Sequence, residues 1–219
     1  MTTDLQTPER ALPTADRLRL IIFDCDGVLF DSWRANVAFY NAVLAAAGQP
    51  ALDDAGEHLC HRFSSPQLYA ALFGSEPATL ARVAEIAATI DYTPFFDLMV
   101  PATDLEASLG RLAAHCPLAL ATNRGRTVAG LLDRFDLQTL FPIHVGILDV
   151  ARPKPAPDML VRCLERASVA PEDAVYIGDT ELDHAAAAAS GIAYIGVGPD
   201  SGATRVVREV RELPALLLD

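Results

Sequence analysis

The sequence predicts an α/β protein whose parallel sheet carries helices on both faces and is interrupted after its first strand by an all-helical segment. Residues 18–23 (LRLIIF) form an apolar run of strand length. Short apolar runs alternate with helical periodicity from about residue 103 to residue 197, and no convincing strand pattern lies between these two regions. Such alternation is typical of right-handed βαβ units, whose strands run parallel.

The first strand is predicted at residues 18–23, because this run is too short to cross a membrane and is typical of a strand buried on both faces. Residues 1–16 are polar and contain proline, unlike a secretory signal, and we expect them to form a flexible tail. After the strand, Ser32 can cap a helix over residues 33–47, which Gly48 would end.

Helical periodicity continues to about residue 101. Helices are predicted at residues 66–73 and 77–90, each with proline in its first turn, and a further helical piece is predicted near residues 95–99. The predicted organisation is therefore a tail at 1–16, an α/β core formed by 17–32 with 102–219, and an inserted helical domain at 33–101.

Strands and helices alternate over the rest of the chain. The predicted helices cover residues 103–115, 126–135, 155–167 and 181–190. The predicted strands cover residues 117–121, 143–147, 174–177 and 193–197. Open α/β sheets bind ligands at the carboxyl ends of their strands, so the residues that follow each strand are the candidates for function.

Composition narrows the class of partner. The 219 residues are 51% hydrophobic and carry a formal net charge of −12, which argues against nucleic acid, since that partner requires excess lysine and arginine. The four cysteines are scattered without a C-x-x-C pair, which favours reduced thiols in the cytoplasm. No apolar stretch reaches the length of a membrane span. A small phosphorylated substrate is still compatible with this charge.

Asp24 and Asp26 follow the first strand in the sequence DCDG. Two carboxylates this close repel, and burial strengthens the repulsion, so a cation or a shared proton must offset it. The pair therefore suggests a metal or acid–base chemistry. The tetrapeptide alone is equally compatible with a simple turn, in which aspartate and glycine are common.

Each later strand end also carries polar groups. Thr122-Asn123-Arg124-Gly125 offers a hydroxyl and backbone amides that lead into a helix, which suits a phosphate, although a capping turn explains the pattern as well. Lys154 stands between prolines that stiffen its loop and is the only lysine of the chain.

The fourth strand end adds acids in the sequence GDTELD. Asp183 lies one helical turn after Asp179 and returns to the same face. Glu181 and Asp183 would favour a helix N-terminus in any case, but that does not explain Asp179.

The order of these four positions, with a helical insert after the first, resembles the haloacid dehalogenase superfamily. More narrowly it is similar to the subfamily with a helical cap after the first motif, which includes phosphoglycolate phosphatases and β-phosphoglucomutases. The resemblance covers residues 18 to 197 and implies a Rossmann-like core with a cap. It implies that Asp24 is the nucleophile and Asp26 the acid–base group. Thr122 matches the hydroxyl of the second motif, and Lys154 matches the lysine of the third. Asp179 and Asp183 match the acids of the fourth motif.

The resemblance also implies a Mg²⁺-dependent phosphatase, a phosphoric monoester hydrolase that forms an aspartyl-phosphate on Asp24. Mg²⁺ would be held by the carboxylates of Asp24 and Asp179 and by the backbone carbonyl of Asp26. Asp183 would bind the ion through water or orient the loop. Phosphoryl oxygens would be bound by the segment that contains Thr122, Asn123 and Arg124, and by Lys154.

Other readings stay open. A sugar phosphomutase is the main alternative, and Val28 does not decide between the two reactions. A non-catalytic binding protein on the same fold is a third. A halide-releasing dehalogenase fits poorly, because that branch usually lacks the second aspartate of the first motif and the metal acids. In the cap, His58, His61, Arg62 and Ser64 are candidates for substrate recognition, with Arg62 favoured for a carboxylate or phosphate. A monomer or a homodimer is expected.

Overall fold

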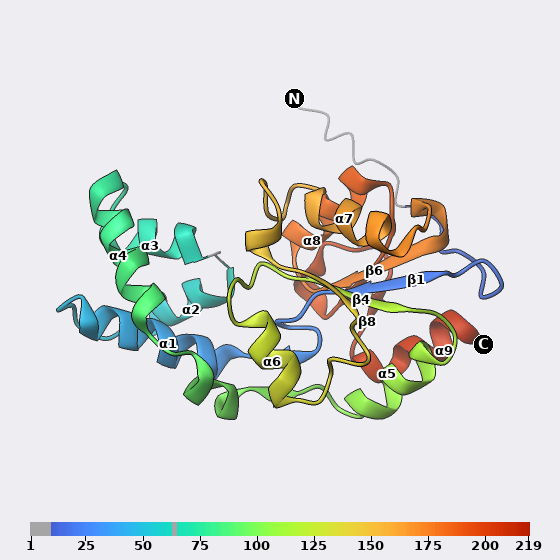
Figure 1. Cartoon of the computed structure of the whole chain (residues 1–219), viewed down its shortest axis with the longest axis horizontal. Helices are drawn as coiled ribbons and strands as arrows, with labels where there is room; N and C mark the ends of the chain where they lie inside the picture. Colours follow the sequence, from blue (N-terminus) through green and yellow to red (C-terminus); the bar gives the residue numbers. More distant parts are fainter. Residues whose placement is uncertain (1–9, 63–64) are drawn as a thin grey trace. The chain divides into compact units, whose positions relative to one another are not determined.

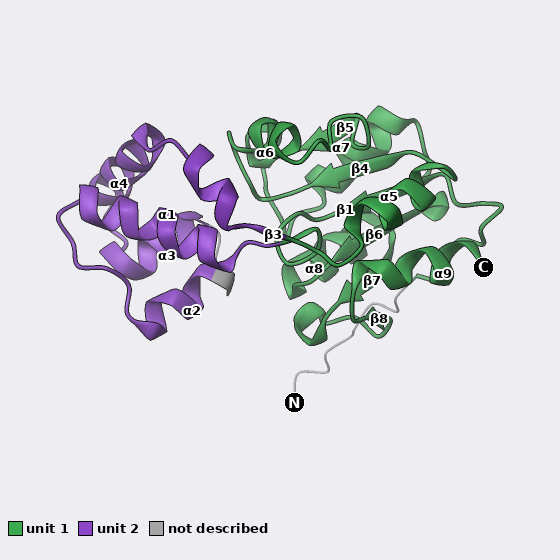
Figure 2. Ribbon diagram, turned by 90° about the horizontal axis from the view of Figure 1, so that it is seen from below, with its two compact units in different colours: residues 1–30, 101–219 green, residues 31–100 purple. Residues whose placement is uncertain are grey.

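The computed structural model describes residues 10–62 and 65–219, which form two compact units (Figures 1 and 2). The core unit comprises residues 1–30 and 101–219, and the helical unit comprises residues 31–100. The chain passes between them through two short strands, β2 (Phe30–Asp31) and β3 (Val100–Pro101), which pair with each other.

The core unit is built on a six-stranded sheet in which all neighbouring strands are parallel. The strand order is β5-β4-β1-β6-β7-β8. The bounds are β1 Leu20–Phe23, β4 Leu118–Ala121, β5 Ile143–Val145, β6 Ala174–Gly178, β7 Ala193–Val197 and β8 Val206–Val207. Because β4 and β6 flank β1, the chain builds the sheet outward in both directions from β1, which creates a switch point at the carboxyl end of this strand. The predicted α/β fold class is confirmed.

Helices cover both faces of the sheet. Figure 1 shows α7 (Asp158–Ala167) and α8 (Glu181–Ser190) on one face, and α5 (Leu105–Ala113) and α9 (Leu213–Leu218) on the other. All four residues of β1 and all four of β4 are buried, which explains why these strands are continuous apolar runs. Burial on both faces leaves only the strand ends for polar chemistry.

Several predicted boundaries in the core unit were wrong by a few residues. The first strand begins at Leu20, because the N–H groups of Arg17 and Leu18 return to the carbonyl of Thr14 in a turn. The helix predicted at 126–135 is α6 (Val128–Arg134), since the preceding residues form a loop. The strand predicted at 143–147 ends at Val145 and is followed by a 3₁₀ turn, Ile147–Asp149.

The helical unit contains α1 (Trp33–Ala46), α2 (Asp54–Arg62), α3 (Ser65–Phe73), α4 (Pro77–Thr89) and a 3₁₀ helix, Thr93–Leu98. Its own apolar core is formed by buried residues of α1, α2, α3 and α4, among them Val43, Cys60, Leu68 and Val83. The helix α2 was not predicted, although the Asp53 side chain accepts a hydrogen bond from the Gly56 N–H at its start.

Ser32 is the N-cap residue of α1, as predicted, but its side chain makes no capping hydrogen bond. The carboxylate of Asp31, rather than the hydroxyl of Ser32, accepts the hydrogen bond from the Trp33 N–H at 3.0 Å. Ser32 is instead buried and its Oγ accepts a longer bond from the Asn36 side chain. Aspartate is as good a hydrogen-bond acceptor at a helix start as serine, and Asp31 takes this role from the position before the N-cap residue.

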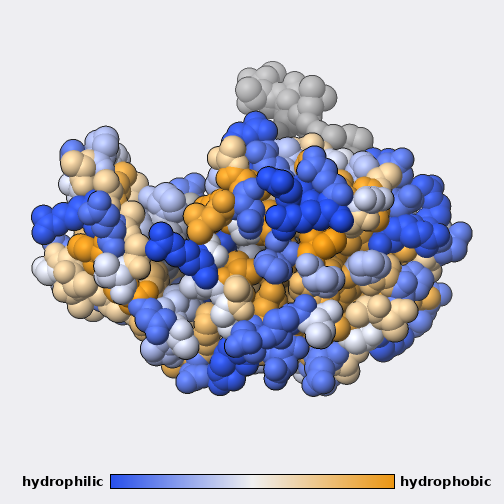
Figure 3. Space-filling view, viewed as in Figure 1, coloured by the Kyte–Doolittle hydropathy of each residue, from blue (hydrophilic) through white to orange (hydrophobic). Residues whose placement is uncertain are grey.

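The surface seen in Figure 3 has hydrophilic and apolar residues interspersed over the core unit. Among the described residues, the most exposed large apolar side chain is Leu148 at 69%. Within the described residues, no helix has the length and apolar character needed to cross a bilayer.

Candidate active site

The loop after β1 places Asp24 at the carboxyl edge of the sheet. The N–H of Asp24 donates to the carbonyl of Ile177 at 2.8 Å, which extends the pairing of β1 with β6 by one residue. The carbonyl of Cys25 then accepts hydrogen bonds from Leu29 and Phe30, closing a tight turn. Cys25 is fully buried, as expected for a residue between two that face the site.

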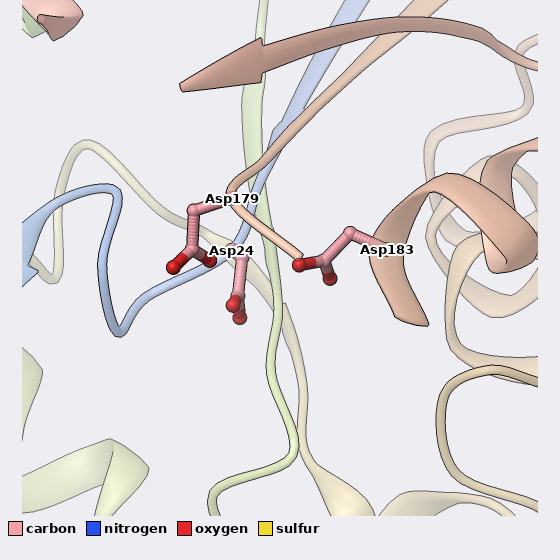
Figure 4. Close-up of side chains that lie close together, drawn as sticks. All are labelled: Asp24, Asp179 and Asp183. Atoms are coloured by element: carbon pink, nitrogen blue, oxygen red, sulfur yellow. The ribbon is translucent and has the colours of Figure 1, made fainter. Parts of the chain in front are cut away.

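Three carboxylates meet at this edge. Asp24 follows β1, Asp179 follows β6 and Asp183 lies in the first turn of α8, and each offers an oxygen within 4.8 Å of the others (Figure 4). Asp24 and Asp183 are buried and Asp179 is half-buried. One oxygen of Asp24 and one of Asp179 are buried without a hydrogen-bond partner among the described residues. Unsatisfied buried oxygens of this kind require a cation or protons.

Gly27 allows Asp179 to approach the loop. Its φ is +78°, and a Cβ at this position would overlap the carboxylate of Asp179. Glycine alone adopts such a backbone conformation at no steric cost. The glycine of the DCDG sequence therefore provides the space in which Asp179 lies, in addition to its role in the turn.

Lys154 supplies the positive charge beside these acids. Its Nζ donates to the carbonyl of Ala121 (3.1 Å), the hydroxyl of Tyr176 (2.9 Å) and Oδ1 of Asp183 (2.7 Å). An ammonium has three hydrogens, so these three acceptors use all of them. Oδ1 of Asp24 lies 2.9 Å from the same nitrogen as an ion pair and is left without a hydrogen bond.

The carboxylate of Asp183 is hydrogen-bonded on both oxygens. Oδ1 accepts from Lys154 and from the Tyr176 hydroxyl (2.6 Å). Oδ2 accepts from the N–H (3.1 Å) and hydroxyl (2.6 Å) of Thr180, which forms a capping box at the start of α8. Asp183 is thus held firmly and is the least available of the three acids as a direct metal ligand.

The electrostatics separate the three acids. Burial raises the pKa of Asp24 to about 7 against the opposing charge of Lys154, and burial together with the charge of Asp24 raises the pKa of Asp179 to about 8. Burial also acts on Asp183, but Lys154 and the hydrogen bonds it receives outweigh it and lower its pKa. Burial opposes the charge of Lys154 as well, yet the neighbouring Asp183 and Asp24 raise its pKa overall.

The residues present fit a divalent cation. Three carboxylates beside one ammonium leave an excess of two negative charges, which such an ion would neutralise. Within this cluster, one buried oxygen of Asp179 has no hydrogen bond and one of Asp24 has only the ion pair with Lys154. An all-oxygen donor set is what a hard ion such as Mg²⁺ prefers.

The loop after β4 holds the lysine loop in place. Thr122 is buried, and its Oγ1 accepts a hydrogen bond from the Arg124 N–H at 3.1 Å. The Asn123 side chain accepts from the N–H of Lys154 (3.2 Å) and donates to its carbonyl (3.4 Å). Asn123 therefore positions Lys154, and among the described residues no hydrogen bond is donated by the Thr122 hydroxyl.

Arg124 pairs with Asp26 across the two loops. Its Nε donates to Oδ2 of Asp26 at 2.7 Å, and its NH2 group donates to Oδ1 at 2.6 Å. The guanidinium side chain is only 8% exposed, and the Asp26 side chain is 33% exposed. This is a bidentate, charge-assisted pair of the strongest geometric type.

Comparison with known proteins identifies the family. A family model described as haloacid dehalogenase-like hydrolase matches residues 21–197, which is most of the chain. The chain belongs to the haloacid dehalogenase-like hydrolase family. The predicted resemblance is therefore confirmed at the level of the family.

Individual proteins similar to this haloacid dehalogenase-like hydrolase include phosphatases and a structure assigned as a mutase. Phosphoglycolate phosphatase 1 of Pseudomonas aeruginosa is 29% identical over 213 residues, covering 92% of this chain and 76% of that enzyme. A subfamily IA hydrolase structure from Geobacter sulfurreducens has a TM-score of 0.77 at 29% identity, covering 94% of this chain and all of that one. A Thermotoga maritima structure assigned as a β-phosphoglucomutase has a TM-score of 0.67 at 27% identity, covering 91% and 98%. The protein is an enzyme of the phosphatase type.

The predicted site residues of this haloacid dehalogenase-like hydrolase fall into three groups. Asp24, Lys154, Asp179 and Asp183 come together directly. Asp26, Thr122, Asn123 and Arg124 lie in the adjoining loops, where Asn123 and Arg124 contact other site residues. The side chains of His61 and Arg62, and all of Ser64, lie outside the described residues, and His58 is exposed with its ring against Trp33 in the helical unit.

The sequence analysis did not identify two residues that hydrogen-bond with the site, Tyr176 and Thr180. Tyr176 lies inside the apolar run of β6, where nothing in the sequence distinguishes it from a core residue. Thr180 could have been found, because a threonine three residues before an acid at a helix start is the signature of a capping box.

Proposed function

We propose that this enzyme is a Mg²⁺-dependent phosphatase that hydrolyses a small phosphorylated metabolite through an aspartyl-phosphate on Asp24. The observation that carries the proposal is the cluster of three carboxylates, Asp24, Asp179 and Asp183, beside the single ammonium of Lys154, in which one buried oxygen of Asp179 has no hydrogen bond. Such an arrangement suits phosphoryl transfer, in which catalysis depends mainly on positioning and charge stabilisation.

Asp24 and Asp179 would hold the metal ion, together with the carbonyl of Asp26, and Asp183 would orient the cluster through Lys154 and Thr180. When bound, the ion would supply charge neutralisation and orient phosphoryl oxygens. The raised pKa values of Asp24 and Asp179 support this assignment, because both groups lack enough positive charge in the protein alone.

The residues of the chain then divide the reaction among them. The carboxylate of Asp24 attacks phosphorus and forms a covalent intermediate. Lys154 and the Thr122 hydroxyl stabilise the negative charge on the phosphoryl oxygens. Asp26 protonates the leaving oxygen and then takes a proton from the water that hydrolyses the intermediate. Asp26 must leave Arg124 and take up a proton from solvent before it can protonate the leaving oxygen, because both of its oxygens accept hydrogen bonds from Arg124.

A phosphorylated carboxylic acid is the preferred substrate, supported by the similarity to the Pseudomonas phosphoglycolate phosphatase. A sugar phosphomutase is the second candidate, because the Thermotoga protein is similar over nearly its whole length. The helical unit would act as the cap that excludes water, with Arg62 retained as a candidate for recognition. A cytoplasmic location is supported by four free, buried cysteines, and a monomer or homodimer is expected.

The decisive experiment measures phosphate release from a panel of phosphorylated metabolites with and without Mg²⁺. The wild type should be active only with the metal, Asp24→Asn should be inactive, and Asp26→Ala should be slower by about 10²- to 10⁴-fold. Asp136→Asn is the matched control, since Asp136 is exposed with φ of +56°, a conformation that asparagine tolerates. Full activity of Asp24→Asn would rule out the nucleophile. Formation of the isomer from glucose 1-phosphate, without phosphate release, would favour the mutase.

A further inference from the structure

The ion pair between Arg124 and Asp26 joins the loop after β4 to the loop after β1. Each oxygen of the carboxylate receives one N–H, at 2.7 Å and 2.6 Å. Asp26 lies two residues after the proposed nucleophile, whereas Arg124 lies two residues after Thr122, whose hydroxyl its own N–H contacts. The guanidinium thus holds a planar, two-oxygen anion next to the place where a phosphoryl group would be bound.

Separating Asp26 from Arg124 costs free energy, and the amount depends on which group then contacts the guanidinium. The Arg124 side chain is 8% exposed, so its charge has little access to water. Removing Asp26 takes two charge-assisted hydrogen bonds from a buried guanidinium, which is unfavourable. A second anion that takes the place of Asp26 offsets this cost, whereas a neutral group does not.

The guanidinium of Arg124 already binds the two oxygens of the Asp26 carboxylate. The second anion that best fits its place is therefore another carboxylate. A guanidinium matches the two oxygens of a carboxylate in one plane. In a phosphorylated 2-hydroxy acid the carboxylate is one carbon from the ester oxygen that Asp26 has to reach. Movement of Asp26 toward the ester oxygen would therefore vacate Arg124 just where the substrate carboxylate arrives.

We propose that Arg124 is a specificity-determining residue that exchanges Asp26 for a carboxylate of the substrate, and so selects phosphomonoesters that carry a carboxylate beside the ester. The proposal rests on the phosphatase function proposed above. It differs from recognition by the helical unit, because every contact that carries it lies within the core unit. It also gives Arg124 a role toward the substrate's acid group rather than toward its phosphoryl group.

The test compares phosphoglycolate with 2-hydroxyethyl phosphate, an ester of similar length with a hydroxyl in place of the carboxylate, in the wild type, Arg124→Gln and Arg126→Gln. Arg126 lies in the same loop but is exposed, so its variant removes the same charge without disturbing the pair. In Arg124→Gln the preference in kcat/KM for phosphoglycolate should fall by about 10- to 100-fold, mainly through KM, as expected for loss of a charged hydrogen-bonding partner. Arg126→Gln should keep the wild-type preference.

Binding provides an independent readout. Calorimetric titration of both esters into Asp24→Asn and Asp24→Asn/Arg124→Gln, with Mg²⁺ present, should show the same loss of preference. Equal weakening of both esters, or an unchanged preference, would overturn the proposal, as would loss of preference in Arg62→Gln alone. If the wild type releases no phosphate from any ester, the phosphatase function fails, and the binding ratio still decides the role of Arg124.

Discussion

Lys154 lies 2.9 Å from Asp24, yet its ammonium gives its hydrogen bonds to Ala121, Tyr176 and Asp183. The proposed nucleophile therefore lies in direct ion-pair contact with the positive charge. Asp183 and Tyr176 hold the lysine in this position. Asp24 is thus left for the chemistry, while Asp183 holds the cation beside it.

The first prediction concerns the charge of Lys154. Lys154→Met should abolish turnover and destabilise the fold at pH 8 by about 3–5 kcal/mol, because it leaves buried carboxylates without their cation. The loss should be smaller near pH 5, where the carboxylates can take up protons. Denaturant unfolding at both pH values measures it. Arg152→Met, which breaks the exposed pair with Asp158, is the control and should leave the free energy of unfolding close to that of the wild type. Similar losses in the two variants would contradict the prediction.

The second prediction concerns pH. The pKa values of Asp24 and Asp179 are raised from 3.8 to about 7 and about 8, so between about pH 4 and pH 8 the folded state binds more protons than the unfolded state. The free energy of unfolding of the metal-free protein should therefore fall as pH rises through this window, by on the order of a few kcal/mol. Asp183 acts in the opposite direction below this window, because its pKa is lowered.

Metal binding should reverse that trend. Mg²⁺ binds ionised carboxylates, so the increase in Tm that it causes should be larger at pH 8 than at pH 6. Thermal unfolding in the presence of a chelator, and then of excess Mg²⁺, provides the comparison. A stability that rises steadily from pH 5 to pH 8 without metal would show that the two raised pKa values are wrong.

The third prediction concerns Gly27. Gly27→Ala should weaken Mg²⁺ binding by at least about tenfold, since the new Cβ displaces the Asp179 carboxylate and metal sites lose about 10- to 100-fold when ligand positions are disturbed. Gly48→Ala is the matched control: its φ is +72° but nothing lies within 4 Å of the added Cβ. It should share the backbone strain of about 1 kcal/mol and keep the metal affinity. Calorimetric Mg²⁺ titration separates the two effects, and equal affinities in both variants would refute the steric argument.

The fourth prediction concerns the Tyr176 hydroxyl. Tyr176→Phe removes an acceptor from Lys154 and a donor from Asp183, which should lower the free energy of unfolding by about 1–3 kcal/mol. It should also lower kcat, because the lysine is less firmly held. Tyr69→Phe makes the same change at a buried tyrosine of the helical unit and should leave kcat unchanged. If both variants behave alike, the hydroxyl has no role in the site.

Much of the architecture could be predicted because its signals are local. A parallel sheet buried on both faces requires apolar runs such as residues 20–23 and 118–121, and the alternation with helices fixes which strand ends share an edge. The same reasoning identified the positions of Asp24, Lys154 and Asp179. Boundaries were less certain, because turns such as the one at Thr14 compete with the strand for the same backbone groups.

The contacts between loops could not be predicted. Asn123 holds the main chain of Lys154 and Arg124 holds Asp26, and neither contact was predicted. Each pairing joins residues far apart in the sequence and depends on the register of neighbouring strands. Tyr176 acts through a single hydroxyl on a residue that otherwise packs in the core, so apolar patterning hides it.

Asp183 has a wider consequence. Its carboxylate accepts a hydrogen bond from Thr180 at the start of α8 and another from the ammonium of Lys154. Ordering of this helix end and organisation of the cationic centre therefore form one cooperative event, and slow hydrogen exchange at the Thr180 amide should report on both. A substitution that tunes the chemistry here also alters folding, so selection for turnover and selection for a folded chain act on one side chain.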